Sequence, residues 1–145
     1  DYYRAVSESF MVSADNAHAV HPNHPQKTDA ENCVYMNEGI VIKSHAGQKY
    51  TSDAVSIAIF RNICKQAGVP VQFFANRSDE AGGSTLGNIS SAQVSLNAVD
   101  VGLPQLAMHS AYETAGIKDT EYMVQAMTTF FGSHISMEKG QIIWS

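Results

Sequence analysis

The chain contains 145 residues, with nine Lys and Arg against fourteen Asp and Glu and a formal net charge of −5. Hydrophobic residues make up 44% of the sequence and charged residues 16%, which suits a single globular domain and is too apolar for a disordered chain. The acidic balance argues against nucleic-acid binding, because neutralising phosphates requires clustered Lys and Arg. Apolar runs long enough to span a membrane do not occur in the sequence.

Strand and helix patterns alternate along the chain. We predict the end of a helix at 3–8, strands at 9–13, 39–43, 71–75 and 98–102, and helices at about 51–67, 90–96 and 120–131. The Pro- and His-rich segment 18–37 is predicted to be a loop, and 82–87 a glycine-rich turn. Short apolar strands alternating with helices indicate an α/β fold, a layered sheet with flanking helices.

The helix expected at 51–67 has the clearest pattern. Thr51 or Ser52 is expected to cap its start, and Gly68 is expected to end it. The apolar stripe predicted to face the core consists of Val55, Ile59 and Ile63, widened by Ala54 and Ala58.

The two cysteines, Cys33 and Cys64, fit no paired metal-ligand spacing. We expect both thiols to be free and buried, and the setting to be reducing and cytoplasmic. The first residues, 1–4, lack the basic and then apolar pattern of a signal peptide and have no initiator Met. The chain is therefore expected to begin within a longer gene product.

The densest group of chemically capable side chains directly follows the first predicted strand. Asp15, His18, His21 and His24 lie within ten residues, and sites in α/β folds form at the carboxyl ends of strands. Aspartate oxygens and histidine nitrogens are ligands for zinc or a similar divalent ion. The alternative is a polar loop in which Asp15 caps a turn and the histidines are solvated.

Residues 15–23 read DNAHAVHPN, which closely resembles the signature of the M18 metallopeptidases, the aspartyl aminopeptidase family. The resemblance extends in the same order over almost the whole chain. Its further blocks are residues 39–43, 48–50, 53–55, 76–79, 83–87, 100–102 and 104–110.

This resemblance implies a two-zinc exopeptidase whose central sheet lies between helices, with an inserted second domain used for assembly into a homo-oligomer. Of the family's key positions, only the downstream Asp and His have counterparts, since an upstream metal-type His and a Glu-Glu pair do not occur in this sequence. We therefore expect residues 1–145 to be the C-terminal part of the catalytic domain, without the upstream half and the assembly domain.

The resemblance also assigns roles to five side chains. Asp15 corresponds to a residue that binds one zinc ion and also lies beside the substrate. His109 corresponds to a ligand of the other zinc ion. His18 corresponds to a catalytic residue that contacts the substrate and stabilises the oxyanion. Lys43 is expected to point into the same depression and pair with an acidic substrate side chain, and Tyr50 to contact the substrate. Taken alone, His109 suits a structural histidine, Lys43 an ordinary strand-end lysine and Tyr50 a half-buried aromatic anchor.

The function implied is a zinc-dependent aminopeptidase that removes N-terminal residues from peptides, preferably Asp or Glu. Two alternatives stay open: a broader-specificity aminopeptidase of the same family, and a non-catalytic structural fragment. Because Asp15 and His109 belong to different ions, each ion would keep one protein ligand here, whereas a catalytic zinc normally has three. We therefore expect these 145 residues alone to be inactive and to bind zinc weakly.

Overall fold

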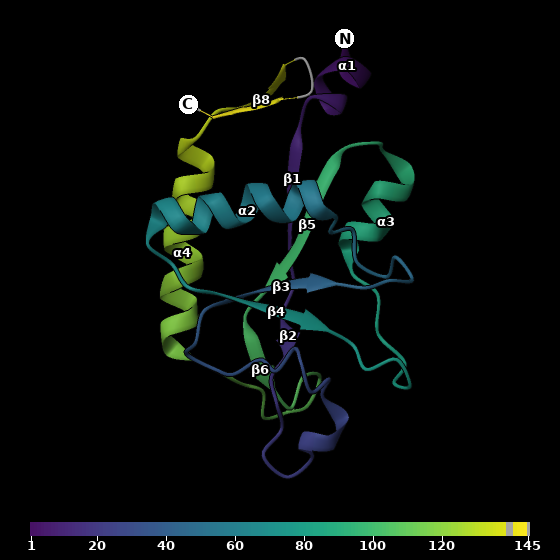
Figure 1. Ribbon diagram of the computed structural model, residues 1–145, viewed down its shortest axis with the longest axis vertical. Helices are drawn as coiled ribbons and strands as arrows, with labels where there is room; N and C mark the ends of the chain where they lie inside the picture. The colour runs from purple at the N-terminus through teal and green to yellow at the C-terminus, as the bar shows by residue number, and fades with distance from the viewer. Residues whose placement is uncertain (139–140, 145) are drawn as a thin grey trace.

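The computed structural model describes residues 1–138 and 141–144 (Figure 1). Its centre is a four-stranded mixed sheet, and the predicted α/β fold class is confirmed. Two parallel pairs of strands, β1 with β5 and β3 with β4, meet at an antiparallel contact between β5 and β3. In spatial order the strands are β1 (Phe10–Ala14), β5 (Asn97–Gly102), β3 (Ile40–Ser44) and β4 (Val71–Ala75).

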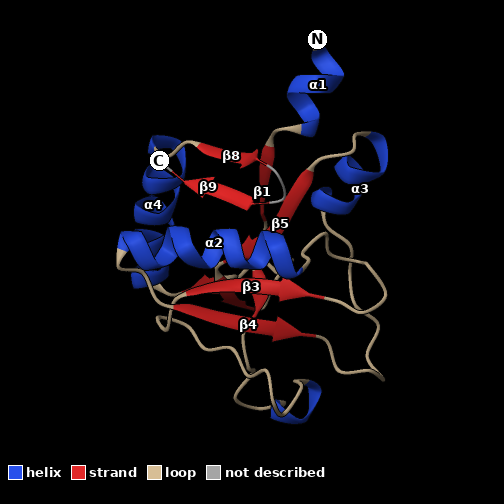
Figure 2. Ribbon diagram, turned by 45° about the horizontal axis from the view of Figure 1, so that its top comes forward, coloured by secondary structure: helices blue, strands red, loops and turns tan. Residues whose placement is uncertain are grey.

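Two long helices, α2 (Ala54–Ala67) and α4 (Ile117–Gly132), pack against each other and the sheet, while α3 (Leu86–Gln93) lies beside β1 and β5 (Figures 1 and 2). Strand β3 contributes to two cores, because successive side chains of a strand point to opposite faces. Ile40 and Ile42 pack in the larger core with the helices, whereas Val41 belongs to a smaller core with Ala17, Val34, Tyr50 and Phe74.

Helix α2 begins one to two residues later than the predicted caps, Ser52 and Thr51, would place it. Its N-cap is Asp53, whose Oδ1 accepts from the Ser56 amide at 2.7 Å while its own amide donates to Ser56 Oγ at 2.9 Å. This reciprocal pair satisfies two amides that a cap at Thr51 or Ser52 would leave open. The predicted end is confirmed, since Gly68 adopts the left-handed conformation with φ of 69°.

Of the five residues predicted to form the apolar stripe of α2, two are confirmed and three are wrong. Ile59 and Ile63 are buried, but Val55 is 42% exposed and both Ala54 and Ala58 face solvent. The row that faces the core lies one position further along the helix. It consists of Ser56, Ile59, Phe60, Ile63 and Cys64.

Several short elements were not predicted. The segment expected to be a loop contains the end of β2 and a 3₁₀ helix, and further strands follow β5 and α4. Helices α3 and α4 begin at residues 86 and 117 rather than 90 and 120. The helix end predicted at 3–8 is confirmed as α1 (Tyr2–Ser7). The elements that were not predicted are β2 (Ala17–His18), η1 (Pro25–Lys27), β6 (Pro104–Leu106), β7 (Thr114–Ala115), β8 (Ile135–Glu138) and β9 (Gln141–Trp144).

The early start of α4 depends on a distant turn. Asp119 is fully buried, and its carboxylate accepts from the amides of Asn37 at 2.6 Å and Gly39 at 3.0 Å. The Asn37 side chain in turn accepts from the Lys118 amide at 3.0 Å. Residues some eighty positions apart thus fix the first turn of this helix.

Both cysteines are free, but only Cys64 is buried, so the prediction of two buried thiols is wrong for the exposed Cys33. Burial raises the pKa of the Cys64 thiol to about 12. Within residues 1–138 and 141–144, the helices are all too short or too polar to cross a membrane.

Candidate active site

Asp15 directly follows β1, and three neighbours fix its main chain. Its amide donates to the carbonyl of Val101 at 2.9 Å, and its carbonyl accepts from Lys43 Nζ at 2.9 Å. A Cβ atom on Gly102 would lie 1.8 Å from the same carbonyl oxygen, so only glycine fits there. The Asp15 side chain itself remains 57% exposed. The sequence therefore places an accessible carboxylate on a fixed backbone at a strand end.

Lys43 lies beneath this turn and is only 2% exposed. Its ammonium contacts the carbonyls of Asp15 and Asn16, lies 4.0 Å from Asp15 Oδ2, and sits 5.2 Å from the centre of the Tyr50 ring. Burial lowers the pKa of Lys43, while the negative charges of Asp15 and Asp100 oppose that shift. The lysine is therefore a buried cation that faces the turn carrying Asp15.

Tyr50 completes the cluster from the segment that leads into α2. It is buried, and its hydroxyl donates to Asn76 Oδ1 at 3.2 Å. Burial, followed by the negative charges of Asp100 and Asp15, raises the pKa of its phenol. Tyr50 thus remains protonated and can donate a hydrogen bond from beside the Lys43 ammonium.

His18 lies on β2, which is held by parallel pairing with β6, where His18 is in register with Gln105. Partial desolvation of its ring, followed by the positive charges of His109 and Lys43, lowers the pKa of His18. Two of the other predicted site residues are thus close enough to act on the imidazole electrostatically. The neutral form of His18 is favoured, and it carries one N–H donor.

His109 is carried by a turn after β6 in which Ala107 and His109 both adopt positive φ angles, 55° and 68°. The Glu113 side chain holds this turn by accepting from the His109 amide at 2.6 Å. His109 is exposed, and it joins the other predicted site residues through its electrostatic effect on His18. A left-handed non-glycine residue is a strained conformation of the kind that gathers at functional sites.

The donors fit zinc in kind but not in number. Asp15 offers a carboxylate oxygen and His109 an imidazole nitrogen, both from exposed side chains. Among the described residues, however, no three His, Cys, Asp or Glu side chains gather closely enough to hold one ion. Since a catalytic zinc normally has three protein ligands, these residues alone do not complete a zinc shell.

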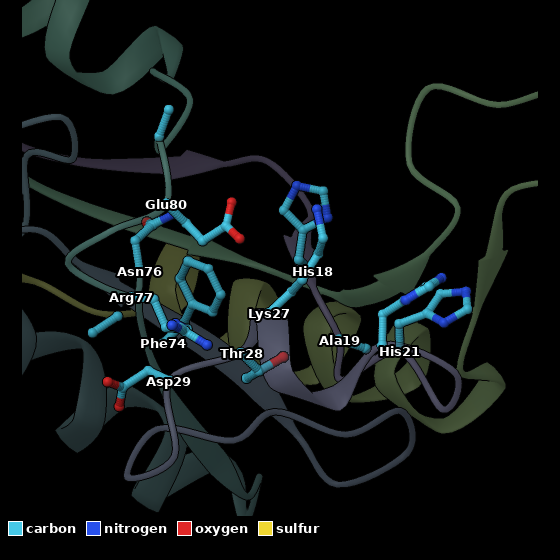
Figure 3. A pocket seen from close by; sticks show the side chains of 13 residues that line it. His18, Ala19, His21, Lys27, Thr28, Asp29, Phe74, Asn76, Arg77 and Glu80 are labelled. Carbon is cyan, nitrogen blue, oxygen red and sulfur yellow. The ribbon is translucent and has the colours of Figure 1, made fainter.

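A cavity of about 300 Å³ adjoins His18. It lies between residues 18–29 and the end of β4 with the segment that follows it, and His18 projects toward it from one side (Figure 3). Lys43, which we expected to point into such a depression, does not line this cavity but is buried beneath the Asp15 turn. Asp15, Tyr50 and His109 do not line it either.

Asp100 is a site residue that the sequence reasoning missed. It is fully buried on β5, and its Oδ2 accepts from both the amide and the hydroxyl of Thr51, at 2.7 and 2.9 Å. It thereby holds the segment that carries Tyr50. Gly87 leaves room for this carboxylate, since a Cβ there would lie 2.8 Å from Asp100 Oδ2. The available signal was a lone acid in the apolar strand 98–102.

Comparison with known proteins gives one family for the model match and the sequence relatives. The family model described as aminopeptidase I zinc metalloprotease (M18) matches residues 1–131. A probable M18 family aminopeptidase 2 of Clostridium acetobutylicum is 49% identical over 131 residues, which are 90% of this chain and 30% of that protein. The protein of the same name in Pseudomonas savastanoi pv. phaseolicola is 42% identical over 134 residues, which are 92% of this chain and 31% of that protein. The chain therefore spans about a third of the length of these relatives.

Solved structures agree with these sequence matches. A chain in the cryo-EM structure of the Ape4 and Nbr1 complex superposes with a TM-score of 0.88 at 39% identity, covering 90% of this chain and 25% of that one. The structure of the S. cerevisiae mApe1 dodecamer matches with a TM-score of 0.80 at 26% identity, covering 91% and 28%. By its family model, its relatives and its fold, the chain belongs to the M18 family of aminopeptidase I zinc metalloproteases.

Proposed function

We propose that the complete protein is a zinc aminopeptidase that releases N-terminal residues from peptides, preferably Asp or Glu. In this proposal residues 1–145 are the C-terminal part of its catalytic domain. Family membership supports the activity. The observation that carries the assignment of the site is the cluster in which Lys43 joins Asp15 and Tyr50, with His18 within electrostatic range of both Lys43 and His109.

Asp15 and His109 would each hold one zinc ion, with the remaining ligands supplied by parts of the protein that this chain does not span. Zinc held there would supply Lewis-acid chemistry for a scissile carbonyl and would activate a water molecule. His18 donates a hydrogen bond to the oxygen that gains negative charge as the carbonyl is attacked. Its lowered pKa favours this role as a neutral donor, and losing such a donor typically costs about 10²–10³ in rate.

Lys43 and Tyr50 are proposed to recognise the acidic side chain. An ammonium has three protons, of which the Asp15 carbonyl takes one at 2.9 Å and the Asn16 carbonyl a second in a long contact of 3.5 Å. The remaining proton and the positive charge suit a substrate carboxylate. On substrate binding, the Tyr50 hydroxyl would exchange its present acceptor, Asn76 Oδ1, for the same carboxylate.

We further propose a homo-oligomeric enzyme in the cytoplasm. The matched mApe1 structure is described as a dodecamer, which favours assembly. Two free thiols without a disulfide among the described residues suit a reducing compartment.

The test is an assay of the full-length gene product on Asp-, Glu-, Leu- and Lys-anilides, before and after removal of zinc with a chelator. The proposal expects fastest release from Asp and Glu, loss of activity on chelation, and recovery when zinc is returned. Equal rates on all four anilides would favour the broader-specificity enzyme. No turnover of any anilide by the zinc-loaded protein would favour a structural role.

A further inference from the structure

The cavity beside His18 has an apolar floor and a charged rim. Ala19, Phe74 and Ala75 form the floor, and Phe74 is only 7% exposed. The rim carries Lys27 and Arg77 against Asp29 and Glu80, so its formal charges cancel (Figure 3). Such a mixture of apolar surface and a few polar groups is typical of small-ligand sites.

Arg77 is a fixed part of this rim rather than a free charge. Its Nε and Nη2 donate to the Asp79 carboxylate at 2.8 and 2.5 Å, and its Nη1 donates to the carbonyl of Gln26. The guanidinium therefore ties the segment 21–29 to the end of β4 across the cavity. Three of its five N–H donors are engaged in this way, and the Asp79 carboxylate pairs with its charge, which disfavours a phosphate or carboxylate as the occupant.

The position of His18 relates the cavity to the proposed chemistry. The imidazole lines the cavity, yet it also lies within electrostatic range of His109 and Lys43. The groups proposed to bind the first substrate residue, Lys43 and Tyr50, do not line the cavity. An aminopeptidase holds its first residue on one side of the scissile carbonyl and its leaving peptide on the other. The cavity is therefore separate from the groups proposed to bind the first residue, and the leaving peptide is the part of the substrate that is left to occupy it.

We propose that this cavity, in the enzyme of the proposed function, binds the side chain of the residue that follows the scissile bond and favours an aromatic or large apolar side chain there. The Phe74 floor supplies the apolar contact. The cancelled charges of the rim give no preference for either sign. The first substrate residue is thus selected by charge, and the second by apolar contact.

The experiment compares three substrates of the full-length enzyme: aspartyl amide, Asp-Gly and Asp-Phe. Two variants fill the cavity from opposite walls, Ala81→Trp and Thr28→Trp, and the control is Ala58→Trp on the solvent-exposed face of α2. The unaltered enzyme should cleave Asp-Phe roughly tenfold more efficiently, in kcat/KM, than Asp-Gly. Both filling variants should bring that ratio close to one while leaving aspartyl amide turnover unchanged, and Ala58→Trp should keep the ratio.

A ratio near one in the unaltered enzyme, or a tenfold ratio that survives in both filled variants, would overturn the inference. Aspartyl amide has no second side chain, so its turnover tests the proposed function separately. An unaltered enzyme that fails on all three substrates would overturn the proposed function and this inference with it.

Discussion

The Lys43 ammonium donates to the carbonyl oxygen of Asp15 at 2.9 Å and lies 4.0 Å from the carboxylate of the same residue. One buried cation is thus coupled to both the backbone and the side chain of the proposed zinc ligand. A substitution at Lys43 should therefore have two effects. It should remove the charge that is proposed to bind the substrate carboxylate, and it should loosen the turn on which Asp15 is carried.

The first effect predicts a change in selectivity. In the full-length enzyme, Lys43→Met should lower kcat/KM on Asp-anilide on the order of ten- to a hundredfold more than on Leu-anilide, because a hydrogen bond to a charged group contributes about 1.5–3 kcal/mol. Steady-state kinetics on the two anilides gives the ratio directly. Lys65→Met, on the exposed side of α2, is the control and should leave the ratio intact. Equal losses on both anilides would assign Lys43 to structure instead.

A second prediction concerns the contact between Gly102 and Asp15. Gly102→Ala should reduce the free energy of unfolding by about 1–3 kcal/mol, since the new methyl group would overlap the Asp15 carbonyl and displace the turn. Urea denaturation followed by circular dichroism measures the change. Gly83→Ala is the matched control, because a Cβ there meets no atom within 4 Å. Equal free energies of unfolding for the two variants would mean that the Asp15 turn moves aside without loss of stability.

A third prediction is that the 145-residue chain binds zinc only weakly. Asp15 and His109 would each give one ligand to a different ion, and one monodentate ligand displaces too little hydration to hold zinc firmly. Calorimetric titration should show no submicromolar site, and Asp15→Asn and His109→Ala should change the isotherm little. Turnover of Asp-anilide should also be absent. Submicromolar binding that both substitutions abolish would show that the two residues share an ion.

The two cysteines should differ sharply in reactivity. The thiolate is the reactive form, and burial raises the pKa of Cys64 to about 12 from an ordinary value of 9.0, while Cys33 is exposed. At pH 8.5, iodoacetamide should modify Cys33 and leave Cys64 intact until urea unfolds the chain, as peptide mass spectrometry would reveal. Because the folded state retains the Cys64 proton, its stabilising effect is present below pH 9.0 and is lost as the pH rises toward 12. Equal modification rates in the native chain would contradict this difference.

Self-association is the fifth prediction. Strand β1 pairs on one side only within the described sheet, and Leu86 and Ile89 on the neighbouring α3 are 75% and 57% exposed. Unpaired strand edges and apolar patches favour association. Light scattering should show dimers or larger species, and the double substitution Leu86→Lys and Ile89→Lys should reduce them. The control is Ile117→Lys on α4, and a monomer at high concentration before any substitution would refute the prediction.

Those parts of the fold that depend on local patterns were predictable from the sequence. The strand β3 and the end of α2 at Gly68 follow from an apolar run and a left-handed glycine. The start of α4 was not predictable in this way, because Asp119 and Asn37 fix it through hydrogen bonds between distant segments. The two-residue strand β2 has no periodicity of its own and forms only by pairing with β6.

The site shows the same division. Asp15 and His18 stood out as a carboxylate and an imidazole at a strand end, while the roles of Lys43 and His109 came from family resemblance. Burial of Lys43 beneath the Asp15 turn could not be foreseen, since strand-end lysines ordinarily extend to water.

Gly102 and the main chain of Asp15 have a consequence for the energetics of ligand capture. The amide of Asp15 donates to the Val101 carbonyl, and its own carbonyl accepts from Lys43. Gly102 packs directly against that carbonyl. Folding therefore removes the backbone conformational entropy of Asp15 before any ion or peptide arrives. Binding has only the side-chain torsions of this residue left to order, and such preorganisation favours affinity and speed over adaptability. A carboxylate on a fixed backbone therefore suits a site that binds ligands in the same geometry at every turnover.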